Sequence, residues 1–263
     1  MLGLLRASHP GPTVVVTTIA VLLAVGVSAT RAMVLLIGVT VLVGQLSIGW
    51  SNDWWDAERD ATIGRGDKPV VTGAVSVSSV RVAALIAGVA SVPLSLLPGW
   101  RAGVCHLLLV ASGWAYNAGL KRVLVSPVPY AVGFGALPAY VWLVVGEPLQ
   151  VWVVAAGSLL GVAAHFANAA PDVVDDRSLG VWGAPQRIGQ KGSLAVAMGA
   201  LGAAGVVLVR QLDAGPAQLV GLAVVLVPIA VSAALLSAER VRAVFAVVMV
   251  AAVADVSLLV WVA

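Results

Sequence analysis

Directly after an apolar run at 33–50 the sequence reads Asn52-Asp53-Trp54-Trp55-Asp56-Ala57-Glu58-Arg59-Asp60. A second acidic stretch follows an apolar run at 151–169 and reads Asp172-Val173-Val174-Asp175-Asp176. The chain has only 12 Asp and Glu residues, and seven of them lie in these two stretches. Charges beside a hydrocarbon layer are costly unless something binds them. The two clusters therefore predict bound cations, and bound cations in turn predict an anionic substrate.

The composition indicates an integral membrane protein. Of the 263 residues 60% are hydrophobic and 10% are charged, whereas a soluble domain carries about 25% charged residues. The chain has one cysteine, Cys105, so a disulfide or a thiolate metal site within the chain is excluded. The net charge of +3 follows membrane topology, and we expect no nucleic-acid partner.

Apolar runs long enough to cross a bilayer recur along the whole chain. A spanning helix needs about 20 mostly apolar residues. Breaks at glycine, proline and charged residues then predict an all-α, multi-pass protein with nine membrane helices. Their approximate bounds are 13–29, 33–50, 77–97, 102–118, 124–145, 151–169, 193–210, 217–236 and 241–262.

The basic residues predict how these spans are oriented. With the N-terminus inside, 12 of the 15 Lys and Arg residues fall on one side, and only Arg31, Arg101 and Arg210 fall on the other. The positive-inside rule assigns the richer side to the cytoplasm. Both acidic stretches lie on that side, as do the two long loops at 51–76 and 170–192. We therefore expect a cell-membrane protein whose active site faces the cytoplasm.

Each acidic stretch would form one polar face if its span continued as a helix. At 100° per residue, Asp53, Asp56 and Asp60 fall within about 60° of one another. A second stripe has spacings of three, four and four and consists of His165, Asn168, Asp172 and Asp176. If the two helices faced each other, the clustered carboxylates would repel strongly unless neutralised. Hard oxygen ligands favour Mg²⁺, which is usually held by a few carboxylates together with substrate phosphates.

Cationic residues in the same cytoplasmic layer complete a diphosphate-binding environment. They include Arg65, Lys68, Lys121 and Arg122. Acidic groups with Mg²⁺, together with Arg and Lys, suit a diphosphate. The rest of such a substrate would lie among apolar helices. A diphosphate head with a lipid tail describes a prenyl diphosphate.

These stretches resemble the UbiA-type intramembrane prenyltransferase superfamily. Residues Asn52 to Asp60 fit its first motif, NDxxDxxxD, without a gap, and Asp172 to Asp176 fit its second motif, DxxxD. The segment Tyr116-Asn117-Ala118-Gly119-Leu120-Lys121 is similar to the end of the family's fourth helix. The family often reads RPxxSG after the first motif, whereas this chain reads Lys68-Pro69-Val70-Val71-Thr72-Gly73. The resemblance implies one domain over 1–263, with nine helices around a central cavity.

The resemblance also implies roles for individual residues. Mg²⁺ would be held by Asn52, Asp53, Asp56, Asp60, Asp172 and Asp176. The diphosphate would be neutralised by Lys68, Lys121, Arg122 and Arg65. Tyr116 would stabilise the allylic cation through its aromatic face. An acceptor cavity would be lined by His165, Gln45 and Asn168. The implied reaction ionises a prenyl diphosphate and transfers the prenyl group to an aromatic or other lipophilic acceptor.

Two other functions remain open at this point. An intramembrane terpene cyclase on the same scaffold would capture the cation with the substrate's own double bonds. An ion-coupled transporter could also carry an acidic site, although such sites usually lie near the bilayer midplane and accompany internal repeats. The sequence does not specify prenyl chain length, acceptor or oligomeric state.

Overall fold

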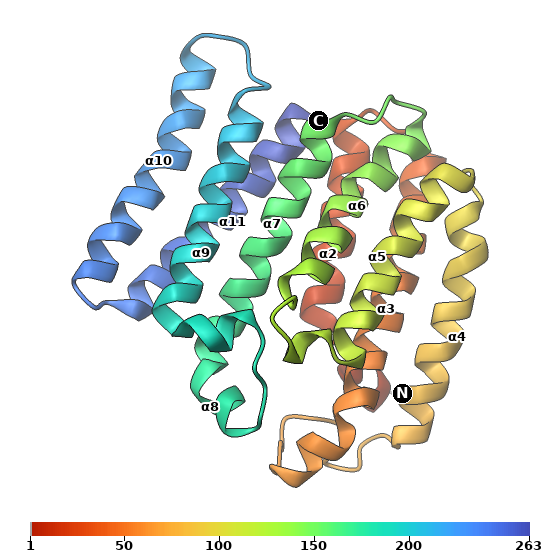
Figure 1. Cartoon of the computed structure of the whole chain (residues 1–263). Coiled ribbons are helices and arrows are strands. Elements are labelled where there is room, and N and C mark those ends of the chain that lie inside the picture. The colour runs from red at the N-terminus through yellow and green to blue at the C-terminus, as the bar shows by residue number, and fades with distance from the viewer. Residues whose placement is uncertain (1) are drawn as a thin grey trace. The chain divides into compact units, whose positions relative to one another are not determined.

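The computed structural model describes residues 2–263, and this part of the chain contains helices, turns and loops but no β-strand (Figure 1). These residues form two compact units. The first comprises residues 2–118 and 140–148, and the second comprises residues 119–139 and 149–263. The all-α prediction is confirmed. A single domain over 1–263 stays a prediction.

The first unit is built around one long helix, α3 (Arg31–Thr62). Its other helices are α1 (Leu2–Ala7), α2 (Pro10–Gly26), α4 (Val77–Leu96), α5 (Trp100–Ala118) and the last turns of α6 (Pro127–Val145). Helix α3 contacts α1, α2, α4 and α5. It begins where the Thr30 hydroxyl accepts a 3.3 Å hydrogen bond from the Met33 N–H. The helix then continues through the whole first acidic cluster, as the sequence predicts.

The second unit is organised around α9 (Ala184–Val209). Its other elements are η1 (Leu120–Arg122), the first turns of α6, α7 (Val151–Ala169), η2 (Ala170–Asp172), α8 (Val173–Ser178), α10 (Pro216–Ser237) and α11 (Val241–Val262). Helix α9 contacts α7, α8, α10 and α11. Helices α6 and α7 approach closely because Gly157 and Gly161 of α7 have no side chain. A methyl group at either position would collide with a backbone carbonyl of α6.

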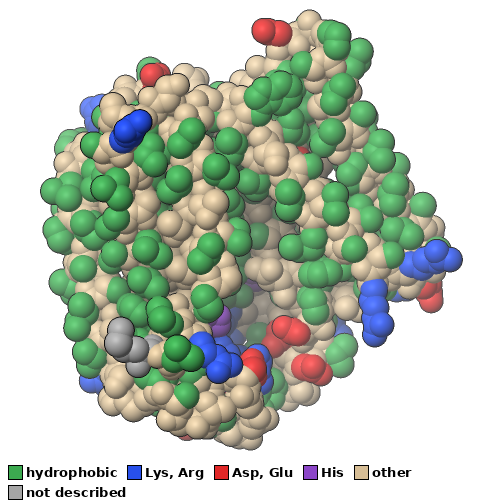
Figure 2. Space-filling view, turned by 180° about the vertical axis from the view of Figure 1, so that it is seen from behind, with side chains coloured by type: hydrophobic (Ala, Val, Ile, Leu, Met, Phe, Trp, Pro, Cys, Tyr) green, Lys and Arg blue, Asp and Glu red, His purple; other side chains and the backbone are tan. Residues whose placement is uncertain are grey.

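The helices show the features of a multi-pass membrane protein. Within residues 2–263, seven helical segments are long and apolar enough to cross a bilayer, namely α3, α4, α6, the α7 to α8 segment, α9, α10 and α11. Helix α2 is apolar but shorter. Many large apolar side chains are exposed, such as Val89, Val151 and Leu219, and Figure 2 shows hydrophobic side chains spread over the face it presents. Each predicted span coincides with a helix, but a count of nine membrane-spanning helices is not confirmed.

One local expectation was wrong. The second stripe requires a continuous helix from His165 to Asp176, but α7 ends at Ala169 and a 3-10 turn precedes α8. The break coincides with Pro171, which has no backbone N–H and whose ring clashes with the preceding turn of an α-helix. Asp172 has φ −98° and ψ 2°, outside the helical range. The residues of this stripe therefore do not share one ideal helix face.

Candidate functional site

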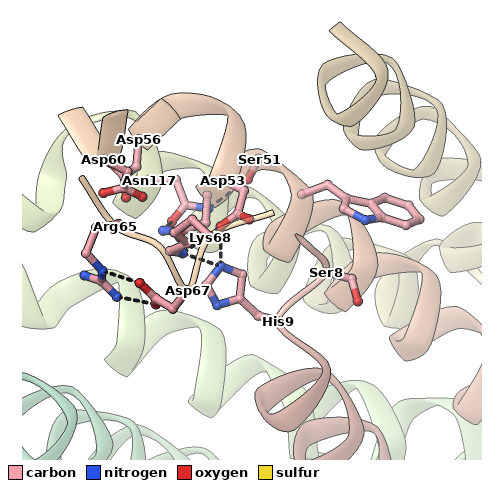
Figure 3. Close-up of polar contacts among 12 residues, drawn as sticks. Ser8, His9, Ser51, Asp53, Asp56, Asp60, Arg65, Asp67, Lys68 and Asn117 are labelled. Carbon is pink, nitrogen blue, oxygen red and sulfur yellow. Dashed lines mark hydrogen bonds and ion pairs between the residues drawn. The ribbon is translucent and has the colours of Figure 1, made fainter. Parts of the chain in front are cut away.

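Three carboxylates of α3 are buried on one face of the helix. Residues Asp53, Asp56 and Asp60 are 2%, 3% and 2% exposed, while Glu58 of the same stretch is exposed. Figure 3 shows Asp56 and Asp60 beside each other and Asp53 next to Lys68 and His9. The helical period thus selects which acids are buried, as the spacing predicts. Buried charges of this kind need partners.

Asp53 contacts a lysine and a histidine nitrogen from other parts of the chain. Lys68 Nζ lies 2.7 Å from its Oδ1, and His9 Nε2 lies 2.8 Å from the same oxygen. Lys68 comes from the α3–α4 loop, and His9 directly precedes α2. The Lys68 and His9 nitrogens are themselves 3.2 Å apart. Lys68 was predicted at this site; His9 was not.

Asp56 and Asp60 share a cation from their own helix. One guanidinium nitrogen of Arg59, Nη2, lies 3.4 Å from Asp56 Oδ2 and 3.3 Å from Asp60 Oδ1. Arg59 is half-buried. Its position between the two acids reduces the repulsion that their burial would otherwise produce. The site therefore already contains two cationic side chains, Lys68 and Arg59, opposite its three carboxylates.

Asn52 is fixed by the end of α5. Its Nδ2 donates a 3.1 Å hydrogen bond to Oδ1 of Asn117. Asn117 is buried, and its own Nδ2 donates to the Ile48 carbonyl at 3.0 Å and to the Ser51 hydroxyl at 2.7 Å. These bonds join α5 to the beginning of the acidic stretch. They also place Tyr116, which is half-buried and adjacent to Asn117, in the same unit as the three carboxylates.

Arg65 lies in the exposed α3–α4 loop. Its Nε and Nη2 donate 2.8 Å hydrogen bonds to the two carboxylate oxygens of Asp67. The Arg65 guanidinium holds the pKa of the Asp67 carboxyl well below its usual range. This bidentate pair orders the loop beside Lys68, and Figure 3 shows it next to the buried cluster. The diphosphate-binding role of Arg65 stays a prediction, as does a cavity role for Gln45, which is half-buried on α3.

An aromatic cluster borders the acidic stretch of α3. Trp54 packs against Trp55 and Trp114, with ring centroids 5.4 and 6.2 Å apart. The Arg81 guanidinium lies 5.8 Å from the Trp54 ring centroid, within the range of a cation–π contact. Trp114 Nε1 donates a 2.9 Å hydrogen bond to the Ser47 hydroxyl. The cluster therefore locks α3, α4 and α5 together beside the site.

The second acidic stretch belongs to the second unit. Asp176 Oδ2 accepts a 2.8 Å hydrogen bond from Nε2 of Gln186, which is buried at the start of α9. Arg177 Nε donates to the Gln186 backbone carbonyl at 2.6 Å. Asp172 is exposed. Gln186 thus helps to orient Asp176, and the sequence interpretation did not identify it.

Other predicted residues of the second unit also have defined places. His165 is buried and its Nε2 is 3.0 Å from the Ser126 hydroxyl, which accepts a bond from the Ala184 N–H. Asn168 is exposed and hydrogen-bonds the side chain of Tyr130. In η1, Lys121 is buried, with 8% exposed, while Arg122 is exposed. Convergence of these residues and the α3 carboxylates on one centre stays a prediction.

The donors on α3 suit Mg²⁺ in their chemistry. They are carboxylate oxygens with an adjacent amide, which are the hard ligands that Mg²⁺ prefers. Within residues 2–263, no group of three or more His, Cys, Asp or Glu side chains is arranged to hold a metal ion.

The sequence predicted the acidic residues but not the residues that contact the predicted site residues. The missed residues are His9, Arg59, Asn117, Ser126, Tyr130 and Gln186. Two of them carried a signal, because Arg59 lies inside the first acidic stretch and Asn117 lies inside the quoted segment that follows Tyr116. The others contact the predicted residues only through tertiary packing, which spacing along the chain does not reveal.

Residues 13–261 match the UbiA prenyltransferase family. The chain is therefore a member of the UbiA prenyltransferase family.

One curated relative and two solved structures illustrate this similarity. A protoheme IX farnesyltransferase of Hyphomonas neptunium is 29% identical over 147 residues, which cover 54% of this chain. The matched region spans less than half, 46%, of that relative's length. A UbiA homologue of Aeropyrum pernix K1, solved in the apo form, superposes with a TM-score of 0.73 at 19% identity, covering 94% of this chain and 96% of that one. A UbiA homologue of Archaeoglobus fulgidus bound to GPP and Mg²⁺ gives 0.71 at 15% identity, covering 97% and 99%. These structures share the fold.

Proposed function

We propose that this protein is a Mg²⁺-dependent intramembrane prenyltransferase. It ionises a prenyl diphosphate and transfers the prenyl group to an aromatic or other lipophilic acceptor. The observation that carries this proposal is the buried face of Asp53, Asp56 and Asp60 on α3, with Lys68 and Arg59 against it. Family membership and the Archaeoglobus fulgidus homologue bound to GPP and Mg²⁺ support it.

In this proposal the acids hold Mg²⁺ against the diphosphate, and the basic residues bind the diphosphate oxygens. Asn52, Asp53, Asp56 and Asp60 would hold Mg²⁺, and Asp172 and Asp176 are assigned to the same task on the sequence motif. Bound Mg²⁺ supplies positive charge for the leaving diphosphate. Lys68, Lys121, Arg122 and Arg65 donate to its non-bridging oxygens. Negative charge grows on the leaving group as the C–O bond breaks, so fixed donors favour the transition state over the ground state.

The remaining residues handle the allylic cation and the acceptor. Tyr116 presents an aromatic ring, and such π faces stabilise a cation while apolar walls exclude water. His165, Gln45 and Asn168 are proposed to line the acceptor site. In the structure His165 is held by Ser126, and Asn168 is held by Tyr130. Ordered polar groups of this kind suit recognition of an acceptor better than flexible ones.

We further propose that the protein resides in the cell membrane with its active site toward the cytoplasm. The distribution of basic residues supports this orientation. A single cysteine placed at Gly66, which is exposed in the α3–α4 loop, tests it in a Cys105→Ser background. A membrane-impermeant maleimide should label this cysteine in inverted vesicles and not in intact cells. Labelling in intact cells alone contradicts the orientation.

One assay tests the reaction. Membranes containing the protein are incubated with Mg²⁺ and prenyl diphosphates of several lengths, with and without a panel of phenols and other lipophilic acceptors. Mass spectrometry should detect an alkylated acceptor, and EDTA should abolish it. A terpene hydrocarbon or alcohol formed without acceptor would identify a cyclase instead. Labelled-ion counterflow in liposomes without any product would favour the transporter.

A further inference from the structure

The N-terminal segment contributes a histidine to the first acidic motif. His9 Nε2 and Lys68 Nζ lie 2.8 and 2.7 Å from the same carboxylate oxygen, Oδ1 of Asp53. A carboxylate oxygen accepts hydrogen bonds, so His9 Nε2 carries a proton and donates it. Figure 3 shows the imidazole and the lysine approaching Asp53 together. His9 is one-third exposed, whereas Asp53 is buried, so the imidazole closes the outer side of the carboxylate.

The segment that carries His9 is docked firmly against α3. Trp50 Nε1 donates a 2.8 Å hydrogen bond to the Leu4 carbonyl of α1. Gly49 lies so close to Ser8 that a methyl group there would collide with the Ser8 backbone. On the other side of His9, the Thr13 hydroxyl donates to the Ser8 carbonyl at 2.8 Å. The position of His9 is therefore built into the fold of this unit.

The same segment also contacts the loop that carries Lys68. A methyl group at Gly3 would collide with the backbone of Ala74, in the α3–α4 loop. The N-terminal segment and this loop therefore support each other, and each supplies one nitrogen to Asp53. Two elements that are remote in sequence are thus held together at the point where their side chains meet.

The backbone at His9 is unusual in a way that suits a functional residue. His9 has φ 53° and ψ 64°, in the left-handed region, and it directly precedes Pro10. Residues other than glycine seldom adopt this conformation, and they persist in it where the surrounding structure fixes them. The docking contacts at Ser8 and Thr13 provide that constraint. The conformation directs the imidazole toward Asp53.

Together His9 and Lys68 present two nitrogen donors to one anion. Their nitrogens are 3.2 Å apart. Lysine presents all its N–H groups from one nitrogen, whereas an arginine side chain offers N–H groups on neighbouring nitrogens in a fixed fork. The non-bridging oxygens of a diphosphate are anionic acceptors like the Asp53 carboxylate. A paired donor that is preformed on Asp53 can therefore turn to a diphosphate oxygen once Asp53 binds a cation.

We propose that His9 is a diphosphate-binding residue that acts with Lys68 as a two-nitrogen donor pair, an inference that rests on the proposed function of this site. The pair has a specific consequence. Replacing Lys68 with arginine supplies both N–H groups from one side chain and makes His9 dispensable. If His9 had only a structural role, Lys68→Arg would not compensate for its loss.

The test measures binding of inorganic pyrophosphate in the presence of Mg²⁺ to the purified full chain, by calorimetry. We expect His9→Ala to weaken pyrophosphate binding about tenfold, the effect of losing one hydrogen bond to a charged group. His9→Gln, which keeps an N–H donor, should retain most of the affinity. Arg6→Gln is the matched control, because it removes an exposed positive charge from the same segment and should change nothing. Melting temperatures without pyrophosphate verify that each variant is folded.

The second step is a double-mutant cycle. In the Lys68→Arg background, His9→Ala should alter pyrophosphate affinity less than about threefold, because the arginine fork replaces both donors. An equal loss in both backgrounds, or no loss in the wild-type background, overturns the donor pair.

Prenyl transfer measured on the same proteins separates the two proposals. If the wild-type protein binds pyrophosphate with Mg²⁺ but transfers no prenyl group, the proposed function is overturned. The donor pair is then still judged by the pyrophosphate affinities of the variants. Normal transfer by wild type, combined with unchanged pyrophosphate binding by His9→Ala, overturns the donor pair alone.

Discussion

Lys68 Nζ lies 2.7 Å from Oδ1 of Asp53, a buried acid of the first motif. The two residues are 15 positions apart, so the α3–α4 loop must fold back over the end of α3 to bring them together. The pair stabilises the loop and also holds the Lys68 ammonium group at the place where a diphosphate is proposed to bind. Structure and function therefore depend on the same contact.

Replacing Lys68 with methionine tests the structural contribution of this contact. The Asp53 carboxylate would remain buried with His9 as its partner, and we expect the free energy of unfolding to fall by about 1–3 kcal/mol. Thermal unfolding in detergent measures this change. Arg65→Met is the control for stability, because the Arg65–Asp67 pair is largely exposed and such pairs contribute about 0–1 kcal/mol. Equal melting temperatures for Lys68→Met and wild type would contradict the structural importance of this contact.

Asp56→Ala should remove turnover without removing the folded protein. Loss of a group that holds charge at the leaving diphosphate lowers kcat about 100-fold or more. Glu58→Gln is the matched control, since Glu58 belongs to the same stretch but is exposed, and we expect it to behave as wild type. Pyrophosphate release reports turnover, and size-exclusion chromatography reports folding. We expect the same loss for Asp172→Ala; retained turnover in both variants would eliminate the metal assignment.

The first acidic motif could be predicted well because its geometry is local. One continuous helix carries Asp53, Asp56 and Asp60, so the 100° step per residue alone determines that they share a face. The membrane helices were predictable for a similar reason, since each depends on a run of apolar residues within itself. Even Arg59 could have been assigned, because residues three apart on a helix are neighbours.

The second motif was predicted less well because one residue interrupts the helix. Pro171 ends α7 at Ala169, so the stripe from His165 to Asp176 is broken by a 3-10 turn. The proline was visible in the sequence, and giving it more weight would have predicted the break. The contact of His9 with Asp53 lay beyond such reasoning. It spans 44 positions and depends on the close approach of Gly49 to Ser8, which only tertiary packing determines.

Gly49→Ala tests whether the docked N-terminal segment matters for the site. The added methyl group would collide with the Ser8 backbone, so the segment must shift and carry His9 away from Asp53. We expect a higher KM for the prenyl diphosphate and a loss of about 1–3 kcal/mol in stability, as is typical of overpacking. Gly11→Ala is the control, because Gly11 has open space around its Cα and should tolerate a methyl group. A KM unchanged by Gly49→Ala would mean that the segment does not position a substrate-binding residue.

Gln186 is expected to act through Asp176, to which its Nε2 donates at 2.8 Å. Gln186→Ala removes this donor and should lower kcat/KM about tenfold, as is usual when a group that orients a metal ligand is lost. Gln186→Glu should be worse than Gln186→Ala, because it places a second carboxylate against Asp176 and the two charges repel. Gln190→Ala, on the exposed side of α9, serves as the control and should retain wild-type activity. If the glutamate variant is as active as the alanine variant, the Gln186–Asp176 bond does not position this acid, and the role of Asp176 must rest on other contacts.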